Sequence, residues 1–279
     1  MPGISVPPIQ PDLNDVKYDA FLANERTLMD PQVVQIEKGG RVLLRIINSA
    51  VMTNFHIDLG DTEATLVAGD GQDMAPISGK RFPIAVAQRL DPLVQAPQSS
   101  RPIPVFFLLE GERRRTGIIL APPGAQIARL SETADDASPA LDLMLEAQRK
   151  ATTPLAARKD DQVVPIDLTG DMADYVWSVN NIVWNEKTPP IELKSGERVE
   201  LVMTNRTGIS QPMHLHGHRY QVVEIGGERL DGARRDTVLV PPGKQVVVAF
   251  DCNNPGHWAF HCHLLYHAHA GMFASFKYS

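Results

Sequence analysis

Short apolar segments alternate with turn-forming residues along most of this chain. The apolar segments are rich in Val and Ile, and Gly, Pro, Asp and Asn stand between them. Short β-branched segments bounded by turn signals are typical of strands, and many of them in sequence favour sandwiches or barrels. The chain is therefore predicted to be all-β, with these candidate strands: 33–37, 41–47, 64–68, 82–86, 105–109, 175–179, 199–204, 219–225, 237–240, 245–250 and 256–260.

The two halves of the chain repeat the same pattern. The stretch "VQIEKGGRVLLRIIN" (34–48) aligns without gaps to "IELKSGERVELVMTN" (191–205), which lies 157 residues further on. With one residue of slack, the alignment continues and places "NFHIDLG" (54–60) on "PMHLHGH" (212–218). Self-similarity of this kind predicts that one β fold occurs twice in tandem.

A change of composition separates the two copies. The stretch "SETADDASPALDLMLEAQRK" is charged, rich in Ala and poor in β-branched residues. Its Ser138 and Pro139 predict the N-cap and first turn of a short helix that continues to about Lys150. The predicted organisation is a domain at 1–125, a linker with this helix at 126–162, and a second domain at 163–279.

The bulk properties narrow the class of protein. With 279 residues, 43% of them hydrophobic, the chain can bury two cores. The net charge of -6 argues against a broad surface for nucleic acid. There is no run of eighteen apolar residues, so we expect no membrane span. The N-terminal "MPGISVPPIQ" lacks the basic start, apolar core and cleavage site of a secretory signal.

Eight of the nine histidines lie in the second half, in two clusters. The clusters are "HLHGH", with His214, His216 and His218, and "HWAFHCHLLYHAHAGM", with His257, His261, His263, His267 and His269. Residues two apart in a strand point the same way, so the first two histidines of "HLHGH" can share a target, as can the pair around Cys262. Cys262 then faces the opposite side. One strand is thus predicted to serve an imidazole centre on one face and a thiolate centre on the other.

The residues after this cysteine favour copper. Cys262, His267 and Met272 have the order and spacing of the thiolate, imidazole and weak thioether ligands of a blue-copper site. Zinc is the rival, but structural zinc sites show paired Cys or Cys/His spacings. A His-rich surface with a buried cysteine, and a methionine that only fills core space, is the remaining alternative.

Other candidate residues are expected to have structural roles. His56 stands where the second copy has His214, but Asp58 replaces the companion histidine, so His56 is expected to be structural. Cys252 is interpreted as a small residue at a strand end, and two cysteines cannot form a disulfide scaffold. His218 and His269 are expected to flank the ligands or lie on the surface.

The histidine motifs resemble those of a known family. "PMHLHGH" followed by "HCHLLYHAHAGM" resembles the C-terminal copper motifs of the multicopper oxidases, which include laccases and bacterial copper-resistance oxidases. The intervening "RRDTVLVPPGKQVVVAFDCNNPGHWAFHCH" is similar as well. The resemblance implies tandem cupredoxin-like Greek-key domains. Residues 10–125 resemble the middle domain, which in the family usually binds no copper, and 163–279 resemble the last domain.

The resemblance also implies a role for each ligand candidate. Type 1 copper would be bound by Cys262 and His267 with axial Met272, type 2 copper by His214, and the type 3 pair by His216, His261 and His263. A small reducing substrate, such as a phenol or a metal ion, would give up electrons one at a time. The backbone around Cys262 would pass them to the histidine cluster, where dioxygen is reduced to water. An extracytoplasmic, for example periplasmic, location is implied too.

Two features depart from the family pattern. The motif normally reads His-Pro-x-His-x-His, and Gln211 stands in its first place, so we expect weak type 1 loading because an amide oxygen is a poor copper ligand. The family's first domain has no counterpart here, which leaves four of the eight histidines expected around the trinuclear cluster. We therefore expect oxidase turnover to need a separate first-domain chain or a homo-oligomer. The alternatives are a copper-binding or storage protein or a truncated relic without turnover, and, third, a zinc-binding β-sandwich.

Overall fold

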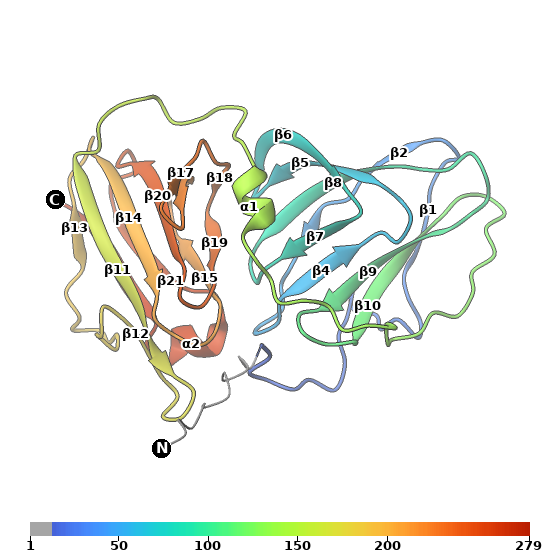
Figure 1. Cartoon of the computed structure of the whole chain (residues 1–279), viewed down its shortest axis with the longest axis horizontal. Coiled ribbons are helices and arrows are strands. Elements are labelled where there is room, and N and C mark those ends of the chain that lie inside the picture. Colours follow the sequence, from blue (N-terminus) through green and yellow to red (C-terminus); the bar gives the residue numbers. More distant parts are fainter. Residues whose placement is uncertain (1–12) are drawn as a thin grey trace, which may run out of the picture.

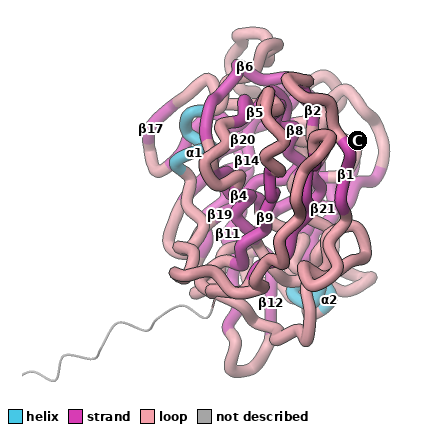
Figure 2. The backbone as a smooth tube through the Cα atoms, turned by 90° about the vertical axis from the view of Figure 1, so that its right-hand side faces the viewer, coloured by secondary structure: helices cyan, strands magenta, loops and turns pink. Residues whose placement is uncertain are grey.

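The computed structural model describes residues 13–279, so the N-terminal stretch without a secretory pattern lies outside the described residues. Two β-sandwiches lie next to each other, one drawn in blue to green and the other in yellow to red (Figure 1). Only two short helices interrupt the strands in the described part of the chain (Figure 2). The predicted all-β tandem fold is confirmed. No helix within residues 13–279 is long and apolar enough to cross a membrane.

The N-terminal sandwich has two facing sheets around an apolar core that includes Leu66, Val94 and Val105. One sheet has the order β1 (Val33–Gln35), β10 (Arg115–Ala121), β9 (Ile103–Leu109), β4 (Phe55–Asp58) and β7 (Arg81–Ile84). The other has the order β2 (Arg41–Leu43), β8 (Arg89–Gln95), β5 (Ala64–Gly69) and β6 (Gln72–Gly79), with β3 (Ile46–Ile47) also paired to β8.

The C-terminal sandwich repeats this plan around a larger core that includes Trp177, Leu201 and Phe260. One sheet has the order β13 (Ile191–Leu193), β22 (Phe273–Tyr278), β21 (His257–Cys262), β15 (Gln211–Leu215) and β19 (Thr237–Val240). The other has the order β12 (Val176–Val179), β11 (Gln162–Asp171), β14 (Arg198–Asn205), β20 (Gln245–Asp251), β16 (Tyr220–Ile225) and β17 (Glu228–Arg229), with β18 (Arg234–Arg235) paired to β16.

Strand pairing confirms the internal duplication. β1 runs parallel to β10, and β13 likewise runs parallel to β22, whereas the other neighbours in these two sheets are antiparallel. β4 and β15 therefore hold the same place in their sheets, as the alignment of 54–60 with 212–218 predicts. The two copies differ at one edge, where β11 and β12 extend only the second sandwich.

The strand pattern missed several elements, and the helix prediction was wrong in detail. The segment 41–47 forms two strands rather than one, and β4, β6, β8, β10, β11, β13, β15, β17, β18 and β22 were not among the predicted strands. Helix α1 (Met144–Gln148) is shorter than expected, and its N-cap residue is Leu143. Ser138 is no cap, because its hydroxyl donates to the carbonyl of Leu109 and its N–H donates to Glu112 at 3.0 Å.

An ionic cluster and a small apolar contact join the sandwiches where α1 lies between them (Figure 1). Arg235 is fully buried, with Nε 2.7 Å from Asp70 and Nη1 2.6 Å from Glu146. Burial raises the pKa of Glu146, whereas the two carboxylates outweigh burial and raise the pKa of Arg235. Buried charges are tolerated only when they are paired, so this cluster fixes how the sandwiches meet.

Candidate metal centre

The pairing of β15 with β21 brings the two histidine motifs together. In this antiparallel register His214 lies opposite His261, and Met213 lies opposite Cys262. Backbone hydrogen bonds continue past the strand ends, because the N–H of His216 donates to Ala259 at 2.9 Å. Since side chains alternate across a strand, the histidines project to one face and Cys262 to the other, as predicted.

Four imidazoles gather on the outer face of this strand pair. The ring centroids of His214, His216, His261 and His263 lie between 4.6 and 5.8 Å from their neighbours. These rings are half-buried or, for His216, exposed. The structure thus brings together all four histidines that the sequence predicts around the cluster.

Hydrogen bonds define the protonation of two of these rings. Nδ1 of His214 lies 2.8 Å from the carbonyl of Asp236, and Nδ1 of His261 lies 2.8 Å from the carbonyl of Cys262. A carbonyl only accepts, so each Nδ1 carries a hydrogen, and each ring in its neutral form has its lone pair on Nε2. His216 Nε2, 3.0 Å from His261 Nε2, is then the donor of that contact. A lone pair on Nε2 is what a metal ion requires.

Burial favours the neutral form of three of the imidazoles. Burial, followed by the neighbouring histidines, lowers the pKa of His261 to about 4, and burial also lowers the pKa of His216 and His263. Burial opposes ionisation of Asp236, but His214 and Arg89 outweigh it and hold the pKa of that carboxyl well below its usual range. Neutral imidazole is the form that binds metals, so the donors suit copper or zinc near neutral pH.

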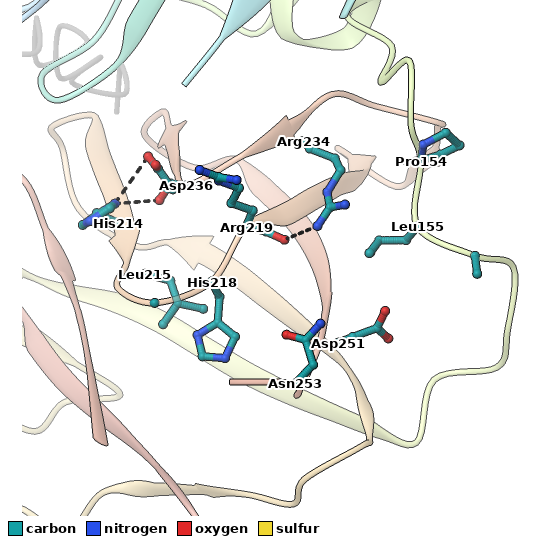
Figure 3. Close-up of a pocket in the computed structure, with 12 residues that line it drawn as sticks. Pro154, Leu155, His214, Leu215, His218, Arg219, Arg234, Asp236, Asp251 and Asn253 are labelled. Atoms are coloured by element: carbon teal, nitrogen blue, oxygen red, sulfur yellow. Dashed lines mark hydrogen bonds and ion pairs between the residues drawn. The ribbon is translucent and has the colours of Figure 1, made fainter. Parts of the chain in front are cut away.

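The cluster is open on one side. A cavity of about 590 Å³ lies beside His214 and is also lined by His218, Arg219 and Arg234. Figure 3 shows His214 and Asp236 in contact at one end of this cavity. Within residues 13–279, no group of three or more His, Cys, Asp or Glu side chains is arranged so that it could hold a metal ion as it stands. The four rings would therefore have to move toward an ion and leave positions for further ligands.

Cys262 lies on the opposite, buried face, together with His267 and Met272. The short helix α2 (Leu265–His269) follows β21 and carries His267 back toward the cysteine. Backbone hydrogen bonds hold Met272, whose carbonyl accepts from Cys262 at 3.1 Å and whose N–H donates to His267 at 2.9 Å. All three side chains are fully buried.

Gln211 stands between the thiol and the imidazole. Its Oε1 accepts from Cys262 Sγ at 3.0 Å and from His267 Nδ1 at 2.9 Å, while its Nε2 donates to Thr207 at 3.1 Å. Burial raises the pKa of Cys262 well above its usual range, and burial lowers the pKa of His267 to about 3. Trp177 stacks on the His267 ring with a centroid distance of 3.7 Å. This set is a neutral hydrogen-bonded core, and its thiol and ring nitrogen are both engaged by an amide oxygen.

The remaining histidines and cysteines have the expected structural settings. His56 is buried and donates from Nε2 to the carbonyl of Pro139 at 3.0 Å. His218 is buried, donates from Nδ1 to the carbonyl of His216 at 3.0 Å, and accepts from the Tyr278 hydroxyl at 2.5 Å. His269 is exposed. Cys252 is buried just after β20, and both cysteines are free thiols.

Sequence reasoning missed three residues that contact the candidate ligands. Asp236 and Thr237 hold His214, and Trp177 stacks on His267. The "RRDTV" stretch, which leads into β19, offered a signal for Asp236, because a charged residue directly before a buried strand needs a partner. Trp177 offered no signal, since its contact arises from β12 passing beside α2.

Comparisons with known proteins agree with this arrangement. Two family models, each described as multicopper oxidase, match residues 158–279 and 10–112. The multicopper oxidase MmcO of Mycobacterium tuberculosis is 30% identical over 272 residues, which are 96% of this chain and 52% of that protein. Copper resistance protein A of Escherichia coli is 36% identical over 116 residues, which are 42% of this chain and 19% of that protein.

Solved structures share the fold. Fet3p, a multicopper oxidase that functions in iron import, superposes with a TM-score of 0.74 at 20% identity, over 89% of this chain and 57% of that chain. A laccase from Botrytis aclada gives a TM-score of 0.75 at 21% identity, over 88% and 53%. The chain spans about half the length of MmcO, although nearly the whole chain aligns with that protein. Matching family models, sequence identity over nearly the whole chain and a common fold show that the chain belongs to the multicopper oxidase family.

Proposed function

We propose that this chain binds copper at His214, His216, His261 and His263 and contributes to the one-electron oxidation of a small donor coupled to reduction of dioxygen to water. The observation that carries this proposal is the convergence of four imidazoles on one face of the β15–β21 pair. Copper bound there would supply the redox chemistry. By family resemblance, His214 serves the type 2 ion and the other three serve the type 3 pair.

The chain's own residues prepare this site in two ways. Carbonyl acceptors fix Nδ1–H of His214 and His261, so that Nε2 of each ring is available to an ion. The peptide 261–263 also joins the histidine cluster directly to Cys262 on the other face. A donor oxidised near Cys262 would thus be connected to the cluster by one short stretch of backbone.

The open side of the cluster supports a need for further ligands. Four imidazoles converge in the described residues where the family pattern has eight, and His216 is exposed. We propose that a first-domain polypeptide carrying two His-x-His pairs, or a second copy of this chain, supplies the remainder. A phenol or a metal ion is the class of donor implied by the resemblance, and an extracytoplasmic location is proposed on the same ground.

Dioxygen consumption tests this proposal. The copper-loaded chain is assayed with a phenolic donor, alone and with a separate first-domain fragment carrying the two His-x-His pairs. We expect no steady consumption by the chain alone and consumption on addition of the fragment, lost in His261→Ala and retained in His269→Ala, which changes an exposed histidine. Turnover by the isolated monomer would show that the four-histidine site suffices and would overturn the requirement for a partner.

A second candidate function is copper binding or storage without oxidase turnover. Gln211 favours it, because its amide oxygen engages both Cys262 and His267 and leaves the buried centre without a second imidazole. Stoichiometric copper binding at the histidine cluster, with no dioxygen consumption even when the fragment is added, would support this candidate over the oxidase.

A further inference from the structure

The segment 234–237 of the C-terminal sandwich is held by two residues of the other sandwich. Asp70 lies in the two-residue turn of the β5–β6 hairpin, where its positive φ of 51° precedes Gly71, as in the Asp-Gly turns of tight hairpins. Its Oδ2 accepts from Arg235 Nε at 2.7 Å, from the backbone N–H of Asp236 at 3.4 Å and from that of Thr237 at 3.3 Å. The hairpin tip therefore fixes the backbone that leads into β19.

Arg89 adds a two-pronged ion pair at the same place. Its Nη1 and Nη2 lie 2.8 and 2.5 Å from the two carboxylate oxygens of Asp236. The guanidinium is itself restrained, because Nη1 donates to the carbonyl of Ala87 at 3.1 Å, and the backbone N–H of Arg89 donates to Asp70 at 2.9 Å. Bidentate pairs of this kind are among the strong, geometrically specific interactions in proteins.

Asp70 and Arg89 hold Asp236 and Thr237, and these two residues in turn hold His214. The carbonyl of Asp236 accepts from His214 Nδ1 at 2.8 Å, and Thr237 Oγ1 lies 3.1 Å from the same nitrogen. Thr237 donates its own hydroxyl hydrogen to the Asp236 carboxylate at 3.0 Å, so its oxygen can accept from the ring. That carboxylate lies 3.6 Å from Nδ1, and Arg89 is the side chain that engages both of its oxygens.

We propose that Arg89 is a positioning residue for the histidine cluster: by engaging the carboxylate of Asp236, it keeps the Nδ1–H of His214 on the carbonyl of Asp236 and Nε2 available to metal. This inference rests on the proposed copper site. The inference goes beyond the copper site itself, because it gives the N-terminal sandwich, which does not contain the histidine cluster, a direct part in building that site.

Two measurements test this role. In the metal-free chain labelled with ¹⁵N-histidine, the ring N–H of His214 is observed by NMR, and its exchange with water is measured. The affinity for Cu²⁺ is then measured by competition with a chelator. In Arg89→Gln we expect faster exchange of the His214 ring proton and roughly tenfold weaker Cu²⁺ binding. A tenfold loss of affinity is at the lower end of what is found when a residue that orients a metal ligand is replaced. Arg89→Lys should restore part of both.

Controls separate positioning from general destabilisation. His56 and His218 also donate a ring N–H to a backbone carbonyl, so their signals in the same spectrum should not change. Arg81→Gln removes another Arg–Asp pair of the same sandwich, with Asp58, and should leave both His214 readouts as in the unmodified chain. If Arg89→Gln does not fold, Asp236→Asn, which keeps the carbonyl and weakens the ion pair, is expected to reproduce both effects.

The outcomes distinguish this inference from the copper proposal. Unchanged ring exchange and Cu²⁺ affinity in Arg89→Gln would overturn the positioning role. Equal acceleration of exchange at His56 and His218 would also overturn it, because it would indicate loosening of the whole fold. If the unmodified chain binds no Cu²⁺ but its His214 ring proton is still released by Arg89→Gln, the copper proposal fails while the positioning of the ring stands.

Discussion

Gln211 and His267 are joined by a hydrogen bond of 2.9 Å from the ring Nδ1 to the amide Oε1, and Cys262 donates to the same oxygen at 3.0 Å. An amide oxygen thus stands where a thiol and an imidazole converge. A copper ion bound by that thiol and that ring would have to displace the oxygen or accept it as a weak ligand. The buried centre and the histidine cluster therefore differ in how readily they could bind metal, although β21 contributes a residue to each.

Replacing the amide by an imidazole should restore a blue-copper centre. With Cu²⁺, the unmodified chain is expected to show weak or no intense absorption in the red, and Gln211→His should produce or strengthen it, because thiolate charge transfer needs Cu(II) held by two imidazoles. Visible absorption of the copper-treated variants measures this. Gln245→His, at the start of β20, is the matched control. Full blue colour in the unmodified chain, unaltered by Gln211→His, would show that another residue supplies the second imidazole.

The turn after His216 depends on a glycine. Gly217 has a φ of +71°, and a Cβ there would lie 2.4 Å from the Trp258 ring. Gly243 has a similar φ of +68° but open space around it. Gly217→Ala should cost more stability than Gly243→Ala, which carries only the strain of about 1–2 kcal/mol. Gly217→Ala should also weaken Cu²⁺ binding, because the displaced turn would move His216. Urea unfolding measures the stability and a Cu²⁺ titration measures the affinity. Equal effects of the two substitutions would exclude a special role for the close approach of Gly217 to Trp258.

The buried ionic cluster between the sandwiches should dominate their docking. Arg235→Ala leaves Asp70 buried without its closest partner and Glu146 with Arg149 alone, and it is expected to destabilise the chain by about 3–5 kcal/mol. Arg206→Ala breaks an exposed pair with Asp167, where a loss of about 0–1 kcal/mol is expected. The free energy of unfolding in urea gives both values. A loss for Arg235→Ala no larger than for Arg206→Ala would show that the buried cluster does not hold the domains.

Acid should destabilise the chain partly through His56. Burial lowers the folded-state pKa of His56 below the ordinary histidine value of about 6.5, so the unfolded state binds more protons as the pH falls. Its contribution to stability is therefore complete above pH 6.5 and is lost as the pH falls through the folded-state pKa. His56→Gln should flatten the decrease of the urea midpoint below pH 6.5. His257→Gln, at an exposed position, should not, and identical slopes in both variants would contradict this role.

The sequence predicted the arrangement of the ligand candidates more accurately than it predicted the strands and their ends. Spacing by two residues was enough to place His261 and His263 on one face and Cys262 on the other, because strand alternation is a local property. The duplication followed from the alignment alone. Strand β15 was missed because its residues, Gln-Pro-Met-His-Leu, have little β-branched character. Its pairing with β19 and β21 makes it a strand.

Local sequence patterns could not predict contacts between segments that are distant in sequence. Ser138 has the residue type of an N-cap, yet it bonds to Leu109 and Glu112 of the first sandwich. Arg89 and Asp236 are 147 residues apart, and only the docked sandwiches place them together. Gln211 was recognisable as a departure from the motif, but its hydrogen bonds to both buried donors required the folded core.

Electron paramagnetic resonance of the chain titrated with Cu²⁺ tests the central claim most directly. Imidazole nitrogens bound to Cu(II) should produce a nitrogen coupling pattern at the first equivalents of metal. We predict that this pattern is lost in the double variant His216→Ala/His261→Ala and kept in His257→Ala/His269→Ala, whose histidines are exposed and outside the cluster. An unchanged copper signal in the first double variant, or its loss in the second, would contradict a copper site at the four-histidine cluster.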